Sequence, residues 1–182
     1  FPLDPDAMAM GRWTGRFRIY GRNDAQSEAP APAAIRVVTP GYFRTLGIPL
    51  LGGRLFRESD QAGSAPVVVI SAALAPHYWQ DKSCLGARIS FDGDKWLTIA
   101  GVVGDVKDKP NSPGAEPAFW WPSLQMAWPV GTMDVVLRAE GDPAALTKEL
   151  RTTVQHLDPT LAVGNVREMD QIVDGSVATP RM

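Results

Sequence analysis

A continuous run of branched apolar residues, Pro66-Val67-Val68-Val69-Ile70, most constrains how this chain can fold. Successive side chains of a strand point to opposite faces of its sheet, so an unbroken apolar run leaves neither face suited to water. β-Branched residues also favour extended backbone over helix. The run therefore predicts a strand inside a sheet that is covered on both faces.

Strands dominate what we expect for residues 11–125. Apolar and polar residues alternate over 13–20, which predicts one half-buried strand. Asp92-Gly93-Asp94 stands between two alternating segments and predicts a hairpin turn. Further strands are expected at residues 35–38, 48–51, 87–91, 95–103 and within the proline-punctuated stretch 117–133.

Two short helices are expected in the same part of the chain. Thr39 as the cap, Pro40 in the first turn and Gly47 as the left-handed stop delimit the first helix. Ser71 is expected to cap the second, and Pro76 falls late enough in it to predict a kink or an early end.

The periodicity changes after residue 132. Residues 133–138 predict a strand, and the next apolar residues follow helical spacing: Leu146, Leu150, Val154 and Leu157. Asp158-Pro159 ends that helix, and residues 161–166 predict another strand. We therefore expect an α+β protein in which a β-rich region at 11–125 is followed by a strand–helix–strand unit at 132–182, with residues 1–10 frayed.

Charge and composition exclude several classes of protein. The net charge is −2 and the pI is near 5.7, so there is no cationic surplus for a nucleic-acid backbone. Cys84 is the single cysteine and His77 and His156 are the only histidines, which argues against multi-cysteine or histidine-rich metal sites. No uninterrupted apolar run is long enough to predict a membrane-spanning helix.

Catalytic patterns are absent as well. The chain contains neither a phosphate-binding glycine loop that opens a helix nor the G-x-S-x-G pentapeptide of serine hydrolases. Turn formation accounts for the acidic residues better than a calcium or sugar-cleaving site does; these residues are Asp92, Asp94, Asp105, Asp108 and Glu116. We therefore expect no enzyme activity, no cofactor and no metal.

Trp120 and Trp121 form the one unusual local pattern. Adjacent residues of a strand face opposite ways, so a sheet with a single covered face would leave one indole exposed. Either the strand is covered on both faces, or an exposed aromatic patch meets a partner, a sugar or a membrane interface. Trp128 would extend such a patch, so Trp120, Trp121 and Trp128 are the candidate interaction residues.

An ordered set of weak motifs resembles the MacB-like periplasmic core domains of FtsX/MacB-type ABC transporter permeases. The longest is VTPGYFRTLGIPLLGGR at residues 38–54. The others are VVVIS at 67–71, LGARI at 85–89, WLTIAGVVGDV at 96–106, GDPAAL at 141–146, LDP at 157–159 and VREM at 166–169. The resemblance covers about residues 34–182 and is greatest to the duplicated orphan permeases typical of acidobacteria.

The resemblance implies an extracytoplasmic (periplasmic) domain with no catalytic residues. In this family a β-rich lobe, called Sabre in the MacB protein, is inserted into a porter-like lobe of strand–helix–strand units. Residues 11–125 would correspond to the Sabre-like lobe, and residues 132–182 to the C-terminal half of the porter-like lobe. The first half of the porter-like lobe would lie upstream of Phe1.

The resemblance also implies partners and a mechanical role. The partners would be transmembrane helices of the same permease, a separate cytoplasmic ATPase subunit and a periplasmic partner protein, and the domain would relay ATP-driven conformational change and dock partners or cargo. The alternative from the residues alone is a carbohydrate- or peptide-binding module that uses exposed tryptophans.

Overall fold

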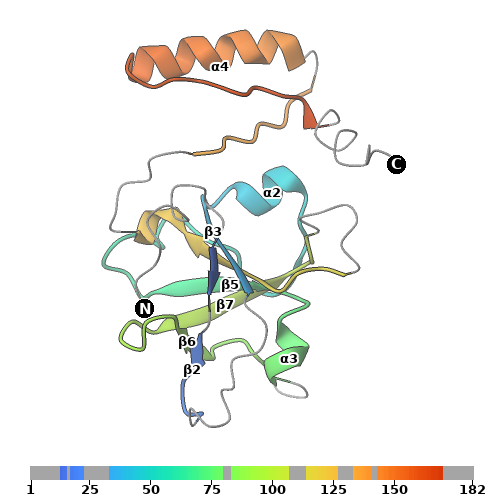
Figure 1. Ribbon diagram of the computed structural model, residues 1–182, viewed down its shortest axis with the longest axis vertical. Coiled ribbons are helices and arrows are strands. Elements are labelled where there is room, and N and C mark those ends of the chain that lie inside the picture. The colour runs from blue at the N-terminus through green and yellow to red at the C-terminus, as the bar shows by residue number, and fades with distance from the viewer. Residues whose placement is uncertain are drawn as a thin grey trace, which may run out of the picture. The chain divides into compact units, whose positions relative to one another are not determined.

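The computed structural model describes residues 13–15, 17–22, 33–79, 83–106, 114–126, 133–140 and 143–169 (Figure 1). The chain divides into two compact units. Unit 1 comprises residues 1–108 and 114–136, and unit 2 comprises residues 109–113 and 137–182. The expected fraying of residues 1–10 and the placement of Trp128 lie outside the described residues.

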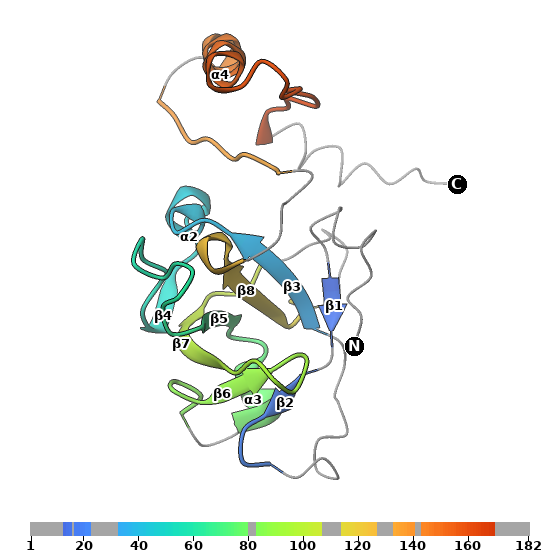
Figure 2. The ribbon, with the colours of Figure 1, turned by 90° about the vertical axis from the view of Figure 1, so that its left-hand side faces the viewer.

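Unit 1 is built on one mixed sheet that, in the described segments, has eight strands (Figure 2). The strands are β1 (Trp13–Gly15), β2 (Arg18–Ile19), β3 (Ala33–Val38), β4 (Leu50–Gly53), β5 (Val67–Ser71), β6 (Arg88–Ser90), β7 (Leu97–Val103) and β8 (Ala118–Pro122). Their order across the sheet is β1-β3-β8-β5-β7-β6-β2, and β4 also pairs with β7. The short helices described in unit 1 are α2 (Tyr42–Leu46), α3 (Ala75–Trp79) and the 3-10 turn η2 (Ser123–Gln125).

Strand β5 occupies the middle of this sheet, as its sequence predicts. It runs parallel to β7 on one side and antiparallel to β8 on the other, and all five of its residues are buried. Val68 and Ile70 contribute to a core on one face of the sheet, whereas Val67 and Val69 contribute to a core on the other. The prediction of a strand covered on both faces is therefore confirmed.

Each face of the sheet has its own apolar core. Aromatic rings dominate the larger core, where Phe17 lies 4.7 Å from Phe119 and 4.6 Å from Tyr78 between ring centroids. The smaller core lies on the α2 side, and its centre is Phe43, which is fully buried. Burial of large apolar and aromatic side chains on both faces is the main source of stability for such a sheet.

Strand β7 bends where β4 and β5 meet it, and two glycines allow the close approach. Its pairing with β5 skips Ala100, which leaves the Ala100 carbonyl free to accept a hydrogen bond from the Arg54 amide at 2.9 Å. A Cβ on Gly101 would lie 2.3 Å from the Arg54 carbonyl oxygen. Gly53 has φ +71°, and a Cβ there would lie 2.2 Å from the Ala100 oxygen. Only glycine fits at these two positions.

The Asp-Gly hairpin is confirmed. Strands β6 and β7 pair antiparallel on either side of the turn, in which Gly93 has φ +90°. The Asp92 carboxylate accepts hydrogen bonds from the Lys95 amide at 2.8 Å and the Asp94 amide at 2.9 Å. Asp92 thus has the turn-forming role that its sequence context predicts.

The prediction of a single strand over 13–20 is wrong. The segment breaks into β1, which pairs with β3, and β2, which pairs with β6 at the opposite end of the sheet. Alternation survives locally, because Phe17 and Ile19 are buried while Arg18 and Tyr20 are exposed. Alternation thus predicted which side chains are buried but could not show that the chain changes partner strand.

Two helix starts also differ from expectation. Helix α2 begins at Tyr42 after an uncapped Gly41, so Thr39 is not its cap, although Gly47 ends it at φ 69° as expected. Ser71 belongs to β5, where its hydroxyl accepts a hydrogen bond from the Ala118 amide at 3.0 Å. Helix α3 starts later, at Ala75, and Pro76 therefore falls in its first turn, where proline needs no helical hydrogen bond.

Unit 2 contains the predicted helix as α4 (Pro143–Leu157). The strands expected at 133–138 and 161–166 are wrong as paired strands: neither segment forms one in the described structure, and nearly all of their residues are exposed. The mixed α and β class is confirmed, although the complete strand–helix–strand unit is not formed. No helix in the described ranges has the length and apolarity needed to cross a membrane.

Candidate functional site

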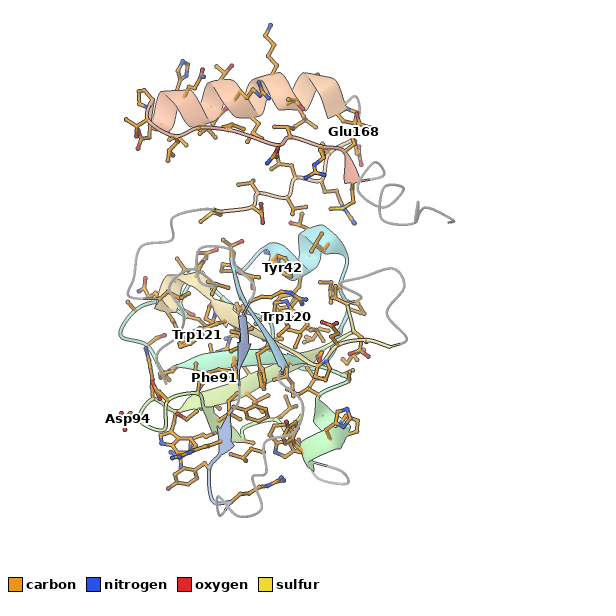
Figure 3. The ribbon with its side chains drawn as sticks, viewed as in Figure 1. Tyr42, Phe91, Asp94, Trp120, Trp121 and Glu168 are labelled. Carbon is orange, nitrogen blue, oxygen red and sulfur yellow. The ribbon has the colours of Figure 1, made fainter. Side chains whose placement is uncertain are left out.

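The tryptophan pair of β8 lies inside unit 1 (Figure 3). Trp120 is fully buried and Trp121 is 7% exposed. Of the two alternatives, an exposed stacking surface at Trp120 and Trp121 does not occur, because β8 lies between β3 and β5 with a core on each face. The other alternative, coverage on both faces, is the one that the structure adopts.

Each indole packs in a different core. Trp120 meets Phe43 edge-on at 5.5 Å between ring centroids, with the Arg36 guanidinium 5.7 Å from its ring. Trp121 stacks near Phe91 at 6.3 Å, with the Lys95 ammonium 5.6 Å from its ring. These contacts make the pair a structural element that joins the two cores through one strand.

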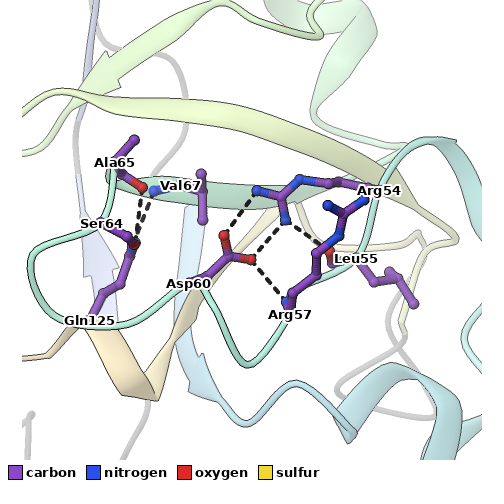
Figure 4. Close-up of polar contacts among 8 residues, drawn as sticks. All are labelled: Arg54, Leu55, Arg57, Asp60, Ser64, Ala65, Val67 and Gln125. Carbon is purple, nitrogen blue, oxygen red and sulfur yellow. Dashed lines mark hydrogen bonds and ion pairs between the residues drawn. The ribbon is translucent and has the colours of Figure 1, made fainter.

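A partly buried ion pair holds the loop between β4 and β5 in place (Figure 4). The Arg54 guanidinium donates to both oxygens of Asp60, at 2.7 and 2.9 Å, and also to the Leu55 carbonyl. The Arg57 amide donates to the same carboxylate. The hydrogen bond from Arg54 lowers the pKa of the Asp60 carboxyl below its usual value.

Gln125 ties the end of β8 to the start of β5. Its side-chain oxygen accepts from the Val67 amide at 3.0 Å, and its amide nitrogen donates to the Ser64 hydroxyl and the Ala65 carbonyl (Figure 4). Gln125 is 7% exposed, so these bonds satisfy a buried amide group. Together with the Arg54–Asp60 pair, they fasten the loop before β5 to the sheet.

Among the residues that the structure describes, burial and local hydrogen bonds account for the shifted pKa values of the titratable groups. Burial raises the pKa of the Cys84 thiol and raises the pKa of the Tyr78 hydroxyl to about 12, which disfavours both anionic forms. His77 and His156 are exposed. No group of three or more potential metal ligands occurs in the part of the chain that the structure describes.

A surface cluster of Tyr20, Arg88 and the half-buried Trp96 combines residue types common at protein interfaces, and no local sequence pattern predicts it. The Arg88 guanidinium carbon lies 3.5 Å above the centre of the Tyr20 ring, and the Trp96 ring meets Tyr20 edge-on at 5.1 Å. Tyr20 and Arg88 come together because their backbones pair across β2 and β6. Tyr20 and Arg88 are almost seventy residues apart in the sequence, so no local motif contains both.

Exposed leucines mark a second surface, around β4. Leu50, Leu51 and Leu85 are 42%, 60% and 39% exposed. Leu85 lies against the glycines of β4, since a Cβ on Gly52 would lie 3.6 Å from a Leu85 methyl carbon. Single exposed leucines are ordinary on protein surfaces, so this group alone assigns no ligand.

Comparison with solved structures supports the fold. The periplasmic region of MacB from Actinobacillus actinomycetemcomitans matches with a TM-score of 0.65 and 17% identity, over 93% of this chain and 74% of that one. A domain described as part of a permease protein from Porphyromonas gingivalis matches with a TM-score of 0.53 and 16% identity, over 91% of this chain and 66% of that one. At these identities the likeness establishes the fold alone.

Comparison with protein families provides the assignment. The curated proteins contain no match to this chain. Residues 4–153, more than half of the chain, match the family described as the MacB-like periplasmic core domain. The chain therefore belongs to the MacB-like periplasmic core domain family, the extracytoplasmic domains of MacB/FtsX-type ABC transporter permeases.

Proposed function

We propose that this domain is a non-catalytic relay in an ABC transporter permease. It would pass conformational change, driven by ATP hydrolysis in a separate cytoplasmic ATPase subunit, to partners or cargo outside the membrane. Transmembrane helices of the same permease would connect it to that ATPase, and a periplasmic protein would dock on it. The observation that carries the proposal is the family match over residues 4–153.

The construction of unit 1 supports a mechanical role. A relay has to move as a body, and cores on both faces of one sheet resist bending of the strands between them. The Arg54–Asp60 pair and the Gln125 contacts extend that stiffness into the loop between β4 and β5. Such a unit can transmit a displacement applied at one edge to its other surfaces.

The chemistry of unit 1 supports the non-catalytic part of the proposal. Asp60 and Asp92, whose carboxyl pKa values are lowered, both owe the shift to hydrogen bonds that hold local structure. The Cys84 thiol is buried, and its raised pKa disfavours the nucleophilic thiolate. Among the described residues of unit 1, the shifted pKa values therefore mark loop, turn and core positions.

We also propose that residues 11–125 form the Sabre-like lobe and residues 132–182 the C-terminal half of a porter-like lobe, bounds that lie close to those of units 1 and 2. A helix flanked by two extended segments has an apolar side that needs further strands to cover it. In unit 2, Leu137, Leu161 and Val166 are 53%, 55% and 37% exposed. Strands contributed by the rest of the permease would bury these side chains.

Hydrogen exchange of the intact permease, assembled with its ATPase, tests the relay. Two states are compared: the nucleotide-free state and the state with a non-hydrolysable ATP analogue bound to the ATPase. We expect the exchange rates of amides in and around unit 2 to differ between these states, whereas amides of β5 and β7 stay equally protected in both. An ATPase subunit unable to bind nucleotide is the control. Identical exchange throughout the domain in both states would refute the relay.

The same method tests the half-lobe separately. In the 182-residue chain, amides of residues 133–140 and 161–166 should exchange rapidly, since they form no paired strands there. In the intact permease these amides should become protected. Rapid exchange in both preparations would show that no further strands complete unit 2, whatever the result with nucleotide.

A further inference from the structure

The cluster of Tyr20, Arg88 and Trp96 is built rigidly on the outer surface of the β2–β6 pair. The register places Ile19 opposite Ile89, and both of these side chains are buried. Alternation then directs Tyr20 and Arg88 outward, and the Tyr20 amide donates to the Arg88 carbonyl at 2.9 Å. The backbone thus fixes both residues before any partner arrives.

The Arg88 side chain is held flat and presents its hydrogen-bonding edge. Its guanidinium carbon stands 3.5 Å from the centre of the Tyr20 ring, which is 55% exposed. Stacking on a ring occupies the face of a guanidinium and leaves the N–H groups at its rim available. Among the residues that the structure describes, no carboxylate pairs with this guanidinium.

The charges nearby favour an anionic partner with few charges. The strands and their turn supply Arg18, Arg88 and Lys95 against Asp92 and Asp94. The Asp92 carboxylate already accepts three hydrogen bonds, from the Ser90 hydroxyl and the Asp94 and Lys95 amides. One net positive charge falls far short of the clusters of about four to eight Lys and Arg residues that hold proteins on anionic membranes.

From these observations we propose that the Tyr20–Arg88–Trp96 surface docks an acidic peptide segment of a partner protein. A carboxylate of that segment accepts two hydrogen bonds from the Arg88 guanidinium, the bidentate geometry that arginine favours. The Trp96 and Tyr20 rings pack against the apolar part of the segment, and Trp, Tyr and Arg are the residue types that dominate binding energy at interfaces. The inference rests on the proposed docking role and names its site and its partner chemistry.

Selection from a displayed library of random linear peptides on the 182-residue chain tests the proposal. We expect recovered peptides to share an Asp or Glu, and replacement of that residue by its amide to weaken binding about tenfold or more. Arg88→Gln should weaken binding to the same extent. Arg44→Gln, which changes an exposed arginine of α2, is the matched control and should leave affinity unchanged.

The role of the ring is tested in the same assay. Tyr20→Ala should lose most of the affinity and Tyr20→Phe should retain it, because stacking needs the ring and not the hydroxyl. Tyr20→Ala combined with Arg88→Gln should cost less than the sum of the two single changes, since both remove the same contact. Circular dichroism of each variant checks that the fold is intact.

Several results would overturn the proposal. Recovery of no peptide, recovery of peptides without an acidic residue, or affinity unchanged by Arg88→Gln would each do so. Binding to phosphatidylglycerol vesicles that Arg88→Gln abolishes, with no acidic peptide recovered, would assign the surface to a membrane instead. The peptide-binding assay uses neither ATP nor the permease. A negative result would therefore refute the docking surface without bearing on the proposed relay, which the hydrogen-exchange experiment tests.

Discussion

Replacing Trp120 by alanine is the sharpest test of the architecture of unit 1. The side chain is fully buried between β3 and β5 and packs on Phe43. A tryptophan buries about 150–250 Å², worth roughly 4–6 kcal/mol at about 25 cal/mol per Å². Measured losses for Trp→Ala in protein cores are about 3–5 kcal/mol, so we expect Trp120→Ala to lower the free energy of unfolding by that amount. Trp121→Ala should cost a comparable amount, because Trp121 packs in the opposite core.

Urea unfolding followed by tryptophan fluorescence is the assay. All six tryptophans belong to unit 1, so the signal reports the unfolding of that unit alone. Trp120→Phe serves as the conservative variant: it keeps an aromatic ring and removes an indole N–H that has no hydrogen-bond partner among the described residues. It should cost clearly less than Trp120→Ala. A loss below about 1 kcal/mol for either alanine variant would mean that the indole is exposed, and the reasoning would fail.

Three further predictions concern other parts of unit 1. Asp60→Asn should lower the free energy of unfolding by about 1–3 kcal/mol at neutral pH, because Arg54 loses its charged partner. Folding lowers the pKa of Asp60, so the contribution of its carboxylate to stability is complete above the unfolded-state pKa of ~3.9 and is lost as pH falls through the folded-state pKa. The urea midpoints of the variant and the wild type should therefore converge in acid. A difference between the midpoints that stays constant with pH would contradict this. Gly101→Ala should lower the free energy of unfolding by about 1–3 kcal/mol, since the new Cβ would meet the Arg54 carbonyl. Gly114→Ala is the control and should be neutral, because open space surrounds Gly114. Equal melting temperatures for the two variants would refute the close approach at Gly101. The Cys84 thiol should react with a disulfide reagent only after unfolding, because it is buried and its pKa is raised, and rapid reaction in the native chain would show that the thiol is exposed.

Local patterns in the sequence were sufficient to predict the centre of the fold. The apolar run 66–70 could only suit a strand with two covered faces, and Asp92-Gly93-Asp94 could only suit a tight turn between strands. Helix α4 followed from its apolar stripe. These elements are determined by side-chain periodicity and turn chemistry, which lie within short windows of sequence.

What the sequence could not predict depends on contacts between distant segments. Residues 13–20 alternate like one strand, yet tertiary pairing divides them between β3 and β6. The strands expected at 133–138 and 161–166 have the right pattern but no partner strand in the described structure. A strand becomes stable only when another strand satisfies its backbone, and no local pattern reports that partner.

The candidate site shows the same division. The sequence identified Trp120 and Trp121 as unusual but could not decide between burial and exposure, because that depends on the layer above each face of β8. The Tyr20–Arg88 pair escaped notice altogether, since the strand register alone brings the two residues together. Periodicity therefore gave candidate residues, whereas tertiary pairing decided their environment.

A distance measurement between the two units of the domain tests the proposed relay most directly. Spin labels on cysteines introduced at Ser59 in unit 1 and Gln155 in unit 2, both exposed, report that distance in the intact permease, and the buried Cys84 stays unlabelled. A second pair at Ser59 and Asp94, both in unit 1, is the control. The account predicts that ATP binding and hydrolysis shift the distance between units while the distance within unit 1 stays fixed. Distances that are the same in every nucleotide state, or a change within unit 1 itself, would contradict it.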